Sequence, residues 1–144
     1  MVYQLIYSSA VCAGVSDDAI IEIARDAQKK NIEIGITGMM LCHQGSILQV
    51  LEGAKSVVEN LYEKIVADNR HTQILRLINR EADMREFGNW AMGFKHIPNT
   101  VSDPTLAPLI AKTYNEILPE NASRVLMSIN QSFARVNEID IYSR

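Results

Sequence analysis

The stretch that most constrains how this chain folds runs from residue 31 to residue 53. Two runs rich in apolar residues, Ile34–Cys42 and Ser46–Leu51, flank a short connector that contains Gly45. Apolar runs separated by a short glycine-containing connector are typical of a β-hairpin. The sequence therefore predicts a pair of antiparallel strands in the middle of the chain.

The segments around this hairpin predict an alternation of strands and helices. Val2–Ser9 is expected to be a strand, and Ser16 is expected to cap a helix whose apolar residues keep helical spacing. A second amphipathic helix over Val57–Val66 and a strand over His71–Ile78 follow the hairpin. The order strand, helix, strand, strand, helix, strand is the split βαβ pattern, which places the third strand between the first two. Trp90–His96 adds a short fifth strand.

The C-terminal part of the chain predicts two more helices. Apolar residues at helical spacing continue up to Pro119, and the pattern repeats over Ala122–Val136. Two helices suffice to cover the second face of the sheet. We therefore expect an α+β fold, a ferredoxin-like βαββαββ sheet over residues 1–97 with two helices on one face. A C-terminal two-helix extension, residues 98–144, covers the other face. The charged stretch Asn79–Glu86 is expected to be a solvated turn without chemistry of its own.

Gln49 is the anomaly in the hairpin. Strand side chains alternate, so Gln49 shares an otherwise apolar face with Ile47 and Leu51. An unmatched buried amide costs roughly 1–3 kcal/mol, so polar partners are expected nearby. The predicted topology brings Tyr7 of the first strand next to Gln49 on the helix-covered face. Asn31, after the first helix, is expected to complete a polar trio; as an alternative, it is a left-handed helix C-cap.

Five motifs occur in order along the first two thirds of the chain: Tyr7 in Ile-Tyr-Ser-Ser, Asn31 six residues before Thr37 in Gly-Ile-Thr-Gly, Gln49 in Leu-Gln-Val-Leu-Glu-Gly, Asp68-Asn69-Arg70-His71, and Trp90-Ala91-Met92-Gly93-Phe94. With these motifs, residues 1–97 resemble the BLUF domain, the blue-light sensor using FAD. The absence of an output enzyme or DNA-binding pattern in the last 47 residues suggests a short, stand-alone version of that family.

The resemblance implies roles for the polar trio. Tyr7 is the expected electron and proton donor to the photoexcited flavin. Gln49 is the expected switch, because its amide can bridge the Tyr7 hydroxyl and the flavin, and its rotation or tautomerisation would red-shift the absorption. Asn31 is expected to hold the polar edge of the flavin ring. A core tyrosine and a structural amide are the plainer interpretations of Tyr7 and Gln49.

Other residues are expected to surround the cofactor. By the same resemblance, Lys64, Asp68, Arg70 and His71 line its ribityl and phosphate part, although a solvated charge explains Lys64 equally well. Trp90 and Met92 are expected to carry the signal from the flavin to the surface, or to be ordinary core residues. Packing around the ring is expected from a further set: Ser8, Ile23, Ile36, Ile65 and Val66. FAD follows from the resemblance, and the residue spacing alone does not separate it from FMN or riboflavin.

The function expected from the resemblance is a flavin photoreceptor without enzymatic turnover that signals to a separate effector protein and forms a homo-oligomer. Two alternatives stay open: a flavin-dependent redox enzyme and a cofactor-free binding module of ferredoxin-like topology. The redox enzyme needs an acid or base over the ring, which the motifs do not supply. An RNA-binding sheet displays aromatics on its central strands, and Ser46–Leu51 has none.

Bulk composition narrows the class further. The net charge of −3 gives no electrostatic case for nucleic acid. Two cysteines, Cys12 and Cys42, are too few for an iron–sulfur cluster or a disulfide framework, and are expected to be free thiols. No apolar run approaches the ~18–20 residues that cross a membrane. We expect no metal site, no membrane contact and a cytoplasmic location.

Overall fold

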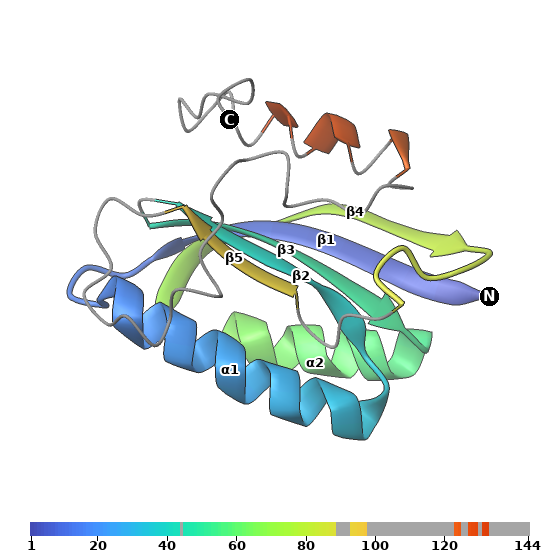
Figure 1. The fold of residues 1–144 in the computed structure, drawn as a ribbon, viewed down its shortest axis with the longest axis horizontal. Helices are drawn as coiled ribbons and strands as arrows, with labels where there is room; N and C mark the ends of the chain where they lie inside the picture. The colour runs from blue at the N-terminus through green and yellow to red at the C-terminus, as the bar shows by residue number, and fades with distance from the viewer. Residues whose placement is uncertain (44, 89–92, 98–122, 125–126, 130, 133–144) are drawn as a thin grey trace.

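The computed structural model describes residues 1–43, 45–88, 93–97, 123–124, 127–129 and 131–132, with the backbone alone for 93–97. The regular elements follow in this order along the chain (Figure 1): β1 Val2–Val11, α1 Asp17–Ile34, β2 Thr37–His43, β3 Ser46–Gly53, α2 Lys55–Ala67, β4 His71–Ala82 and β5 Gly93–Ile97. Both helices and the hairpin occur close to where the sequence predicts them. Helix α1, however, continues through Asn31, expected after the helix, to Ile34, expected in the hairpin.

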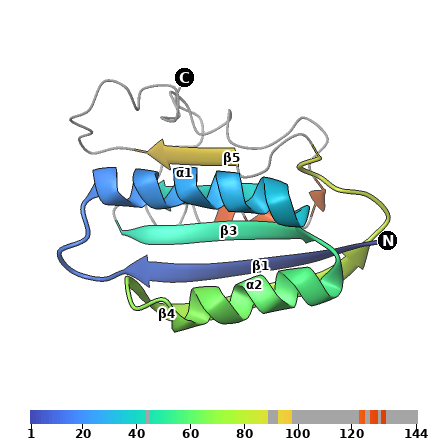
Figure 2. The same cartoon turned by 90° about the horizontal axis from the view of Figure 1, so that it is seen from below.

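The strands form one sheet in the order β4-β1-β3-β2-β5. All neighbours are antiparallel except β2 and β5, which run parallel. The expectation that the third strand lies between the first two is confirmed. Figure 1 shows α1 and α2 on the same side of the sheet, and Figure 2 shows β1 and β3 running between the two helices. The side chains of the two central strands that point to this face therefore lie between α1 and α2.

Helix α1 has a distinct chemical signal at each end. The Ser16 hydroxyl accepts a hydrogen bond from the backbone N–H of Ala19, as the sequence predicts for an N-cap. The helix continues to Ile34, and Gly35 ends it in the left-handed region at φ 71°. The alternative of Asn31 as a left-handed C-cap is therefore wrong. Asn31 lies in the last turn, and Gly35 takes that conformation at lower cost because it has no Cβ.

Gly38 has a different role, at the close approach of β2 to β3. A Cβ at this position would come within 1.9 Å of the carbonyl oxygen of Val50. The strand therefore needs glycine here for space. The two glycines of the Gly-Ile-Thr-Gly motif thus serve separately, one to end α1 and one to let β2 pair closely with β3.

The core lies between the sheet and the two helices. It is built by the helix-facing residues of the central strands and the inner faces of the helices: Tyr3, Leu5, Tyr7, Ile20, Ile21, Ala24, Ile36, Met40, Cys42, Ile47, Leu51, Val58 and Tyr62. Ile23, which the sequence assigned to the buried stripe of α1, is half-buried, while Ile21 is fully buried. No helix in the part of the chain that the structure describes is long and apolar enough to cross a membrane.

The prediction of a solvated turn over Asn79–Glu86 is wrong for residues 79–82, which are strand, although Asn79, Glu81, Asp83 and Met84 are exposed. Strand β4 continues to Ala82, and the residues after it bind the sheet. The carboxylate of Glu52, 1% exposed, accepts hydrogen bonds from the backbone N–H groups of Glu86 and Phe87 at 2.7 and 2.9 Å. The backbone at the end of this stretch therefore binds a buried carboxylate, which hydropathy alone does not reveal.

The C-terminal predictions fall mostly outside the described residues. These include the helix that Pro119 was expected to end, and Trp90 and Met92 of the fifth strand. Within the predicted helix over Ala122–Val136, residues 124, 127–129 and 131–132 are helical. They lie on the side of the sheet opposite α1 and α2 in Figure 1. Ser123 joins this segment to the sheet, since its backbone N–H donates to Glu86 Oε1 at 2.5 Å.

Candidate functional site

Tyr7 and Gln49 form the centre of the candidate site. They are register partners across β1 and β3, and both face the helices. The Tyr7 hydroxyl donates a hydrogen bond to Gln49 Oε1. Tyr7 is 3% exposed and Gln49 6%. Strands β1 and β3, paired in the sheet, therefore bring a phenol and a carboxamide into direct contact, as the topology predicts.

The protonation of this pair is set by its burial. Burial raises the pKa of Tyr7, and the neighbouring Tyr62 and Asp68 raise it further. The Tyr7 hydroxyl is therefore neutral at physiological pH and acts as the donor. Because Gln49 Oε1 accepts from Tyr7, the amide N–H groups of Gln49 point away from the phenol.

Two rings lie beside Tyr7, one from α2 and one from the start of β4. The Tyr62 ring lies 5.6 Å from the Tyr7 ring, centre to centre, at an interplanar angle of 59°. The His71 ring lies 6.4 Å away in an edge-on arrangement. Sequence reasoning placed Tyr62 in the apolar stripe of its helix but gave it no part in the site. Its helical spacing from Val58 was the available signal.

His71, expected to line the cofactor, is held by two neighbours. Its Nε2 lies 2.6 Å from the carbonyl oxygen of Ile65, and its Nδ1 lies 2.9 Å from the Ser9 hydroxyl. A carbonyl oxygen only accepts, so Nε2 carries a proton, and in the neutral ring Nδ1 accepts from Ser9. His71 thereby ties the start of β4 to β1 and α2. Ser9 was missed, although it alternates with Tyr7 onto the same face.

Asp68 and Arg70 pair with each other at the end of α2. Arg70 Nε donates to both carboxylate oxygens of Asp68, at 2.9 and 3.0 Å, and the Arg70 backbone N–H donates at 3.0 Å. This hydrogen bonding by Arg70 lowers the pKa of Asp68 to about 2, against the opposing effect of burial. The two groups are thus engaged with each other in this structure, whereas the sequence led us to expect separate contacts to phosphate and ribityl groups.

The other residues that were expected to surround the cofactor are partly buried and partly at the surface. Asn31 is 2% exposed, and its carbonyl oxygen accepts from the N–H of Ile36 at 3.0 Å. Ile36 is buried and Ile65 packs against the same core. Lys64 is exposed in the last turn of α2. Val66, expected to pack around the ring, is 48% exposed at the end of α2.

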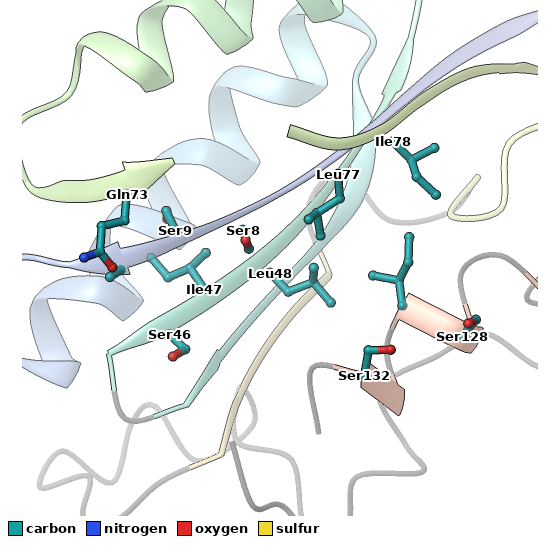
Figure 3. Close-up of a pocket in the computed structure, with 12 residues that line it drawn as sticks. Ser8, Ser9, Ser46, Ile47, Leu48, Gln73, Leu77, Ile78, Ser128 and Ser132 are labelled. Carbon is teal, nitrogen blue, oxygen red and sulfur yellow. The ribbon is translucent and has the colours of Figure 1, made fainter. Parts of the chain in front are cut away.

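Ser8 also departs from expectation, because it lies on the other face of the sheet. It pairs with Leu48, and both line a cavity of about 540 Å³ between the sheet and the C-terminal helical residues. Figure 3 shows Ser8 beside Leu48, with Ser128 and Ser132 across the cavity. Because strand side chains alternate, Ser8 lies on the face opposite Tyr7. The expectation that both surround one ring did not take this alternation into account.

The donor set fits a flavin ring. An isoalloxazine offers an apolar body and one edge of alternating carbonyl and N–H groups. The helix-covered side of the sheet offers apolar walls, including Ile36 and Ile65, and the hydrogen-bonded phenol and amide of Tyr7 and Gln49. A further buried amide, Asn31, lies in the last turn of α1. Amides match such an edge because each carries both donors and an acceptor. Among the described residues, no group of three or more potential metal ligands gathers.

Comparison with known proteins decides the family. The family model described as "BLUF: Sensors of blue-light using FAD" matches residues 2–93, more than half of the chain. The chain belongs to the BLUF family. The match spans β1 to the start of β5 and includes Tyr7, Asn31 and Gln49.

Relatives of this BLUF chain include subunits of photoactivated adenylate cyclases. The beta subunit from Euglena longa is 31% identical over 112 residues, which is 74% of this chain and 13% of that protein. The alpha subunit from Euglena gracilis is also 31% identical, over 11% of its length. The chain therefore spans only a small part of these curated relatives.

Solved structures agree on the fold. A bacterial light-regulated adenylyl cyclase matches with a TM-score of 0.64 and 33% identity, over 96% of this chain and 36% of that one. BlrP1 of Klebsiella pneumoniae, with FMN and cyclic diGMP, matches with a TM-score of 0.68 and 26% identity, over 94% and 36%. The ground state of BlsA matches with a TM-score of 0.65 and 26% identity, over 100% of this chain and 90% of that chain.

Proposed function

We propose that this BLUF chain is a blue-light photoreceptor that binds a flavin noncovalently and uses the Tyr7–Gln49 contact as its switch. The observation that carries the proposal is the buried hydrogen bond from the Tyr7 hydroxyl to Gln49 Oε1 on adjacent central strands. The family description supports FAD as the cofactor. FMN in a related BlrP1 structure supports a site that accepts other flavins.

The bound flavin would supply absorption of blue light and, once excited, an oxidant. Tyr7 is buried and neutral, so its loss of an electron is coupled to loss of its proton. The Gln49 carbonyl oxygen already holds that proton in a hydrogen bond. Proton movement within an existing hydrogen bond avoids a separate search for an acceptor.

Gln49 can then exist in two arrangements. In the present one its carbonyl oxygen faces Tyr7. After a half-turn of the amide, the N–H groups face Tyr7 and the carbonyl oxygen faces the side where they were. Tautomerisation of the amide would exchange donor and acceptor in place. Either change presents different hydrogen-bonding groups to the ring edge, which accounts for a red-shifted state.

Other residues would hold the cofactor. Asn31, Ile23, Ile36 and Ile65 lie on the helix-covered side with the switch. Lys64, Asp68, Arg70 and His71 lie at or beyond the end of α2, where a ribityl phosphate tail would pass. Because Asp68 and Arg70 bind each other, contact with the tail requires them to exchange partners. Trp90 and Met92 complete the expected route from the ring to the surface.

The output is proposed to pass to a separate effector protein, with the photoreceptor acting as a homo-oligomer. The likeness to BlsA, matched over 90% of its chain, motivates the proposal of a separate effector. A light-dependent change in the mass of the assembly, measured by light scattering in darkness and under blue light, tests this part of the proposal.

The switch itself is tested by an absorption spectrum of the purified protein before and after blue light. A red shift of the flavin bands that decays in darkness is expected. Tyr7→Phe should abolish the shift while flavin stays bound, because the phenylalanine has no proton or accessible electron to give. Tyr3→Phe is the matched control, since Tyr3 lies on the same face of β1 but bonds to Glu59 instead. A normal shift in Tyr7→Phe would refute the mechanism.

A further inference from the structure

A second phenol lies next to the proposed electron donor. The Tyr62 ring, from α2, is 5.6 Å from the Tyr7 ring between centres, and both residues are buried. Two phenols are similarly easy to oxidise in the same surroundings. An oxidised Tyr7 therefore has a neighbour within electron-transfer distance that can supply the electron it has lost.

A fixed cation covers the second phenol. The guanidinium carbon of Arg76 lies 4.6 Å from the centre of the Tyr62 ring. Both terminal nitrogens of Arg76 bind the Glu59 carboxylate, at 2.9 and 2.8 Å. The Tyr3 hydroxyl donates to the same carboxylate at 2.5 Å. A two-point contact of this kind fixes the plane and position of the guanidinium.

The positive charge of Arg76 affects the ease of oxidation of the two phenols differently. A cation over an aromatic face is attracted to the π electrons of the neutral ring, and it repels the same ring once an electron has been removed. The guanidinium of Arg76 stands over the Tyr62 ring, while its terminal nitrogens bind the Glu59 carboxylate. Tyr62 is therefore harder to oxidise than a phenol without such a partner, while the described cation–ring contacts leave Tyr7 uncovered.

We propose that Arg76, held by Glu59, confines the oxidation to Tyr7 by preventing electron transfer from Tyr62 to oxidised Tyr7. This inference rests on the proposed photoreceptor function, with the excited flavin as oxidant. In the prevented step, Tyr62 loses an electron to oxidised Tyr7 and its hydroxyl proton to solvent, and Tyr7 takes back its own proton from the Gln49 carbonyl oxygen. The missing electron would then be on Tyr62 and no longer on Tyr7, the phenol that donates to Gln49, and its return would not turn the amide.

Arg76→Gln tests this directly, because it removes the charge and keeps amide donors for Glu59. The yield of the red-shifted state per absorbed photon should fall at least about threefold, as expected for loss of a cation–π contact. Transient absorption should show a longer-lived tyrosyl radical, and electron paramagnetic resonance after freezing under light should detect it. In the dark holoprotein, peroxynitrite should nitrate a larger fraction of Tyr62, since that reaction begins with one-electron oxidation.

Three companion variants make the result decisive. Arg76→Gln with Tyr62→Phe should recover the yield of Tyr62→Phe alone, because phenylalanine cannot supply an electron to oxidised Tyr7. Arg76→Lys retains a cation and should stay close to the parent protein. An unchanged yield in Arg76→Gln, or no recovery in the double variant, overturns the inference alone. A parent protein without any red shift overturns the proposed function and this inference with it.

Discussion

At the residue scale, the site depends on which atoms of Tyr7 and Gln49 face each other. A carboxamide has two faces of opposite hydrogen-bonding character, while a neutral phenol both donates and accepts. The pair therefore supports two complete hydrogen-bond arrangements of similar geometry. Its burial keeps water from competing with either one. A switch of this type needs no large backbone movement at the residues where it begins.

The Asp68–Arg70 pair predicts a specific pH dependence. The pKa of Asp68 is lowered from 3.8 to about 2 in the folded protein. The carboxylate therefore contributes stability above about pH 4, and this contribution is lost as the pH falls through about 2. The difference in free energy of unfolding between the parent and Asp68→Asn should shrink over that interval. Urea unfolding at a series of pH values measures it, and a constant difference would contradict the pairing.

At the element scale, the hairpin and its register could be predicted because the relevant signals are local. The apolar runs on either side of Gly45 and the alternation around Gln49 need only neighbouring residues. Strand alternation also determines the opposite facing of Ser8 and Tyr7. The long reach of β4 and the ties of Glu52 to residues 86 and 87 could not be predicted, because they join segments more than thirty residues apart. Charge in a sequence window does not reveal a distant buried partner.

Glu52 gives the strongest stability prediction. Its carboxylate also accepts from Gln4 Nε2 at 3.1 Å and from the Thr37 hydroxyl at 3.0 Å. Glu52→Ala leaves these donors and two backbone N–H groups without their acceptor in a buried place. We expect a loss of about 2–4 kcal/mol in the free energy of unfolding, measured by denaturant titration.

The matched control for Glu52→Ala is Glu63→Ala on the exposed side of α2, which should change stability by less than about 0.5 kcal/mol. Equal effects of the two substitutions would mean that the buried network around Glu52 does not hold the segment after β4 in place.

At the scale of the whole molecule, the arrangement of layers explains why the site lies where it does. The helices cover one face of the sheet on either side of β1 and β3 (Figure 2), so the central strands present their side chains between them. The order of elements was sufficient to predict this. The choice among flavins was not, because it depends on how charged groups near the end of α2 pair in three dimensions.

That pairing leads to a prediction about cofactor choice. Arg70 and Lys64 are largely exposed, and Arg70 is engaged with Asp68. Exposed ion pairs contribute about 0–1 kcal/mol, so contacts to the phosphate tail add little to binding. Riboflavin should therefore bind within about tenfold of FAD by fluorescence titration. A hundredfold preference for FAD would show that the tail is specifically held.

Flavin should also stabilise the fold as a whole. A ligand that binds only the folded state at a free concentration 100 times its dissociation constant adds about 2.7 kcal/mol to the free energy of unfolding. Thermal unfolding at increasing flavin concentrations should therefore show a rising midpoint. A midpoint independent of flavin would contradict a site inside the folded core.

The most direct measurement is the light-minus-dark absorption difference spectrum of Gln49→Leu, recorded beside the parent protein at equal flavin content. Leucine keeps the approximate size of the side chain but cannot accept the Tyr7 proton or exchange donor for acceptor. The account predicts a reversible red-shift signal in the parent and none in the variant. A full, reversible red shift in Gln49→Leu would contradict it.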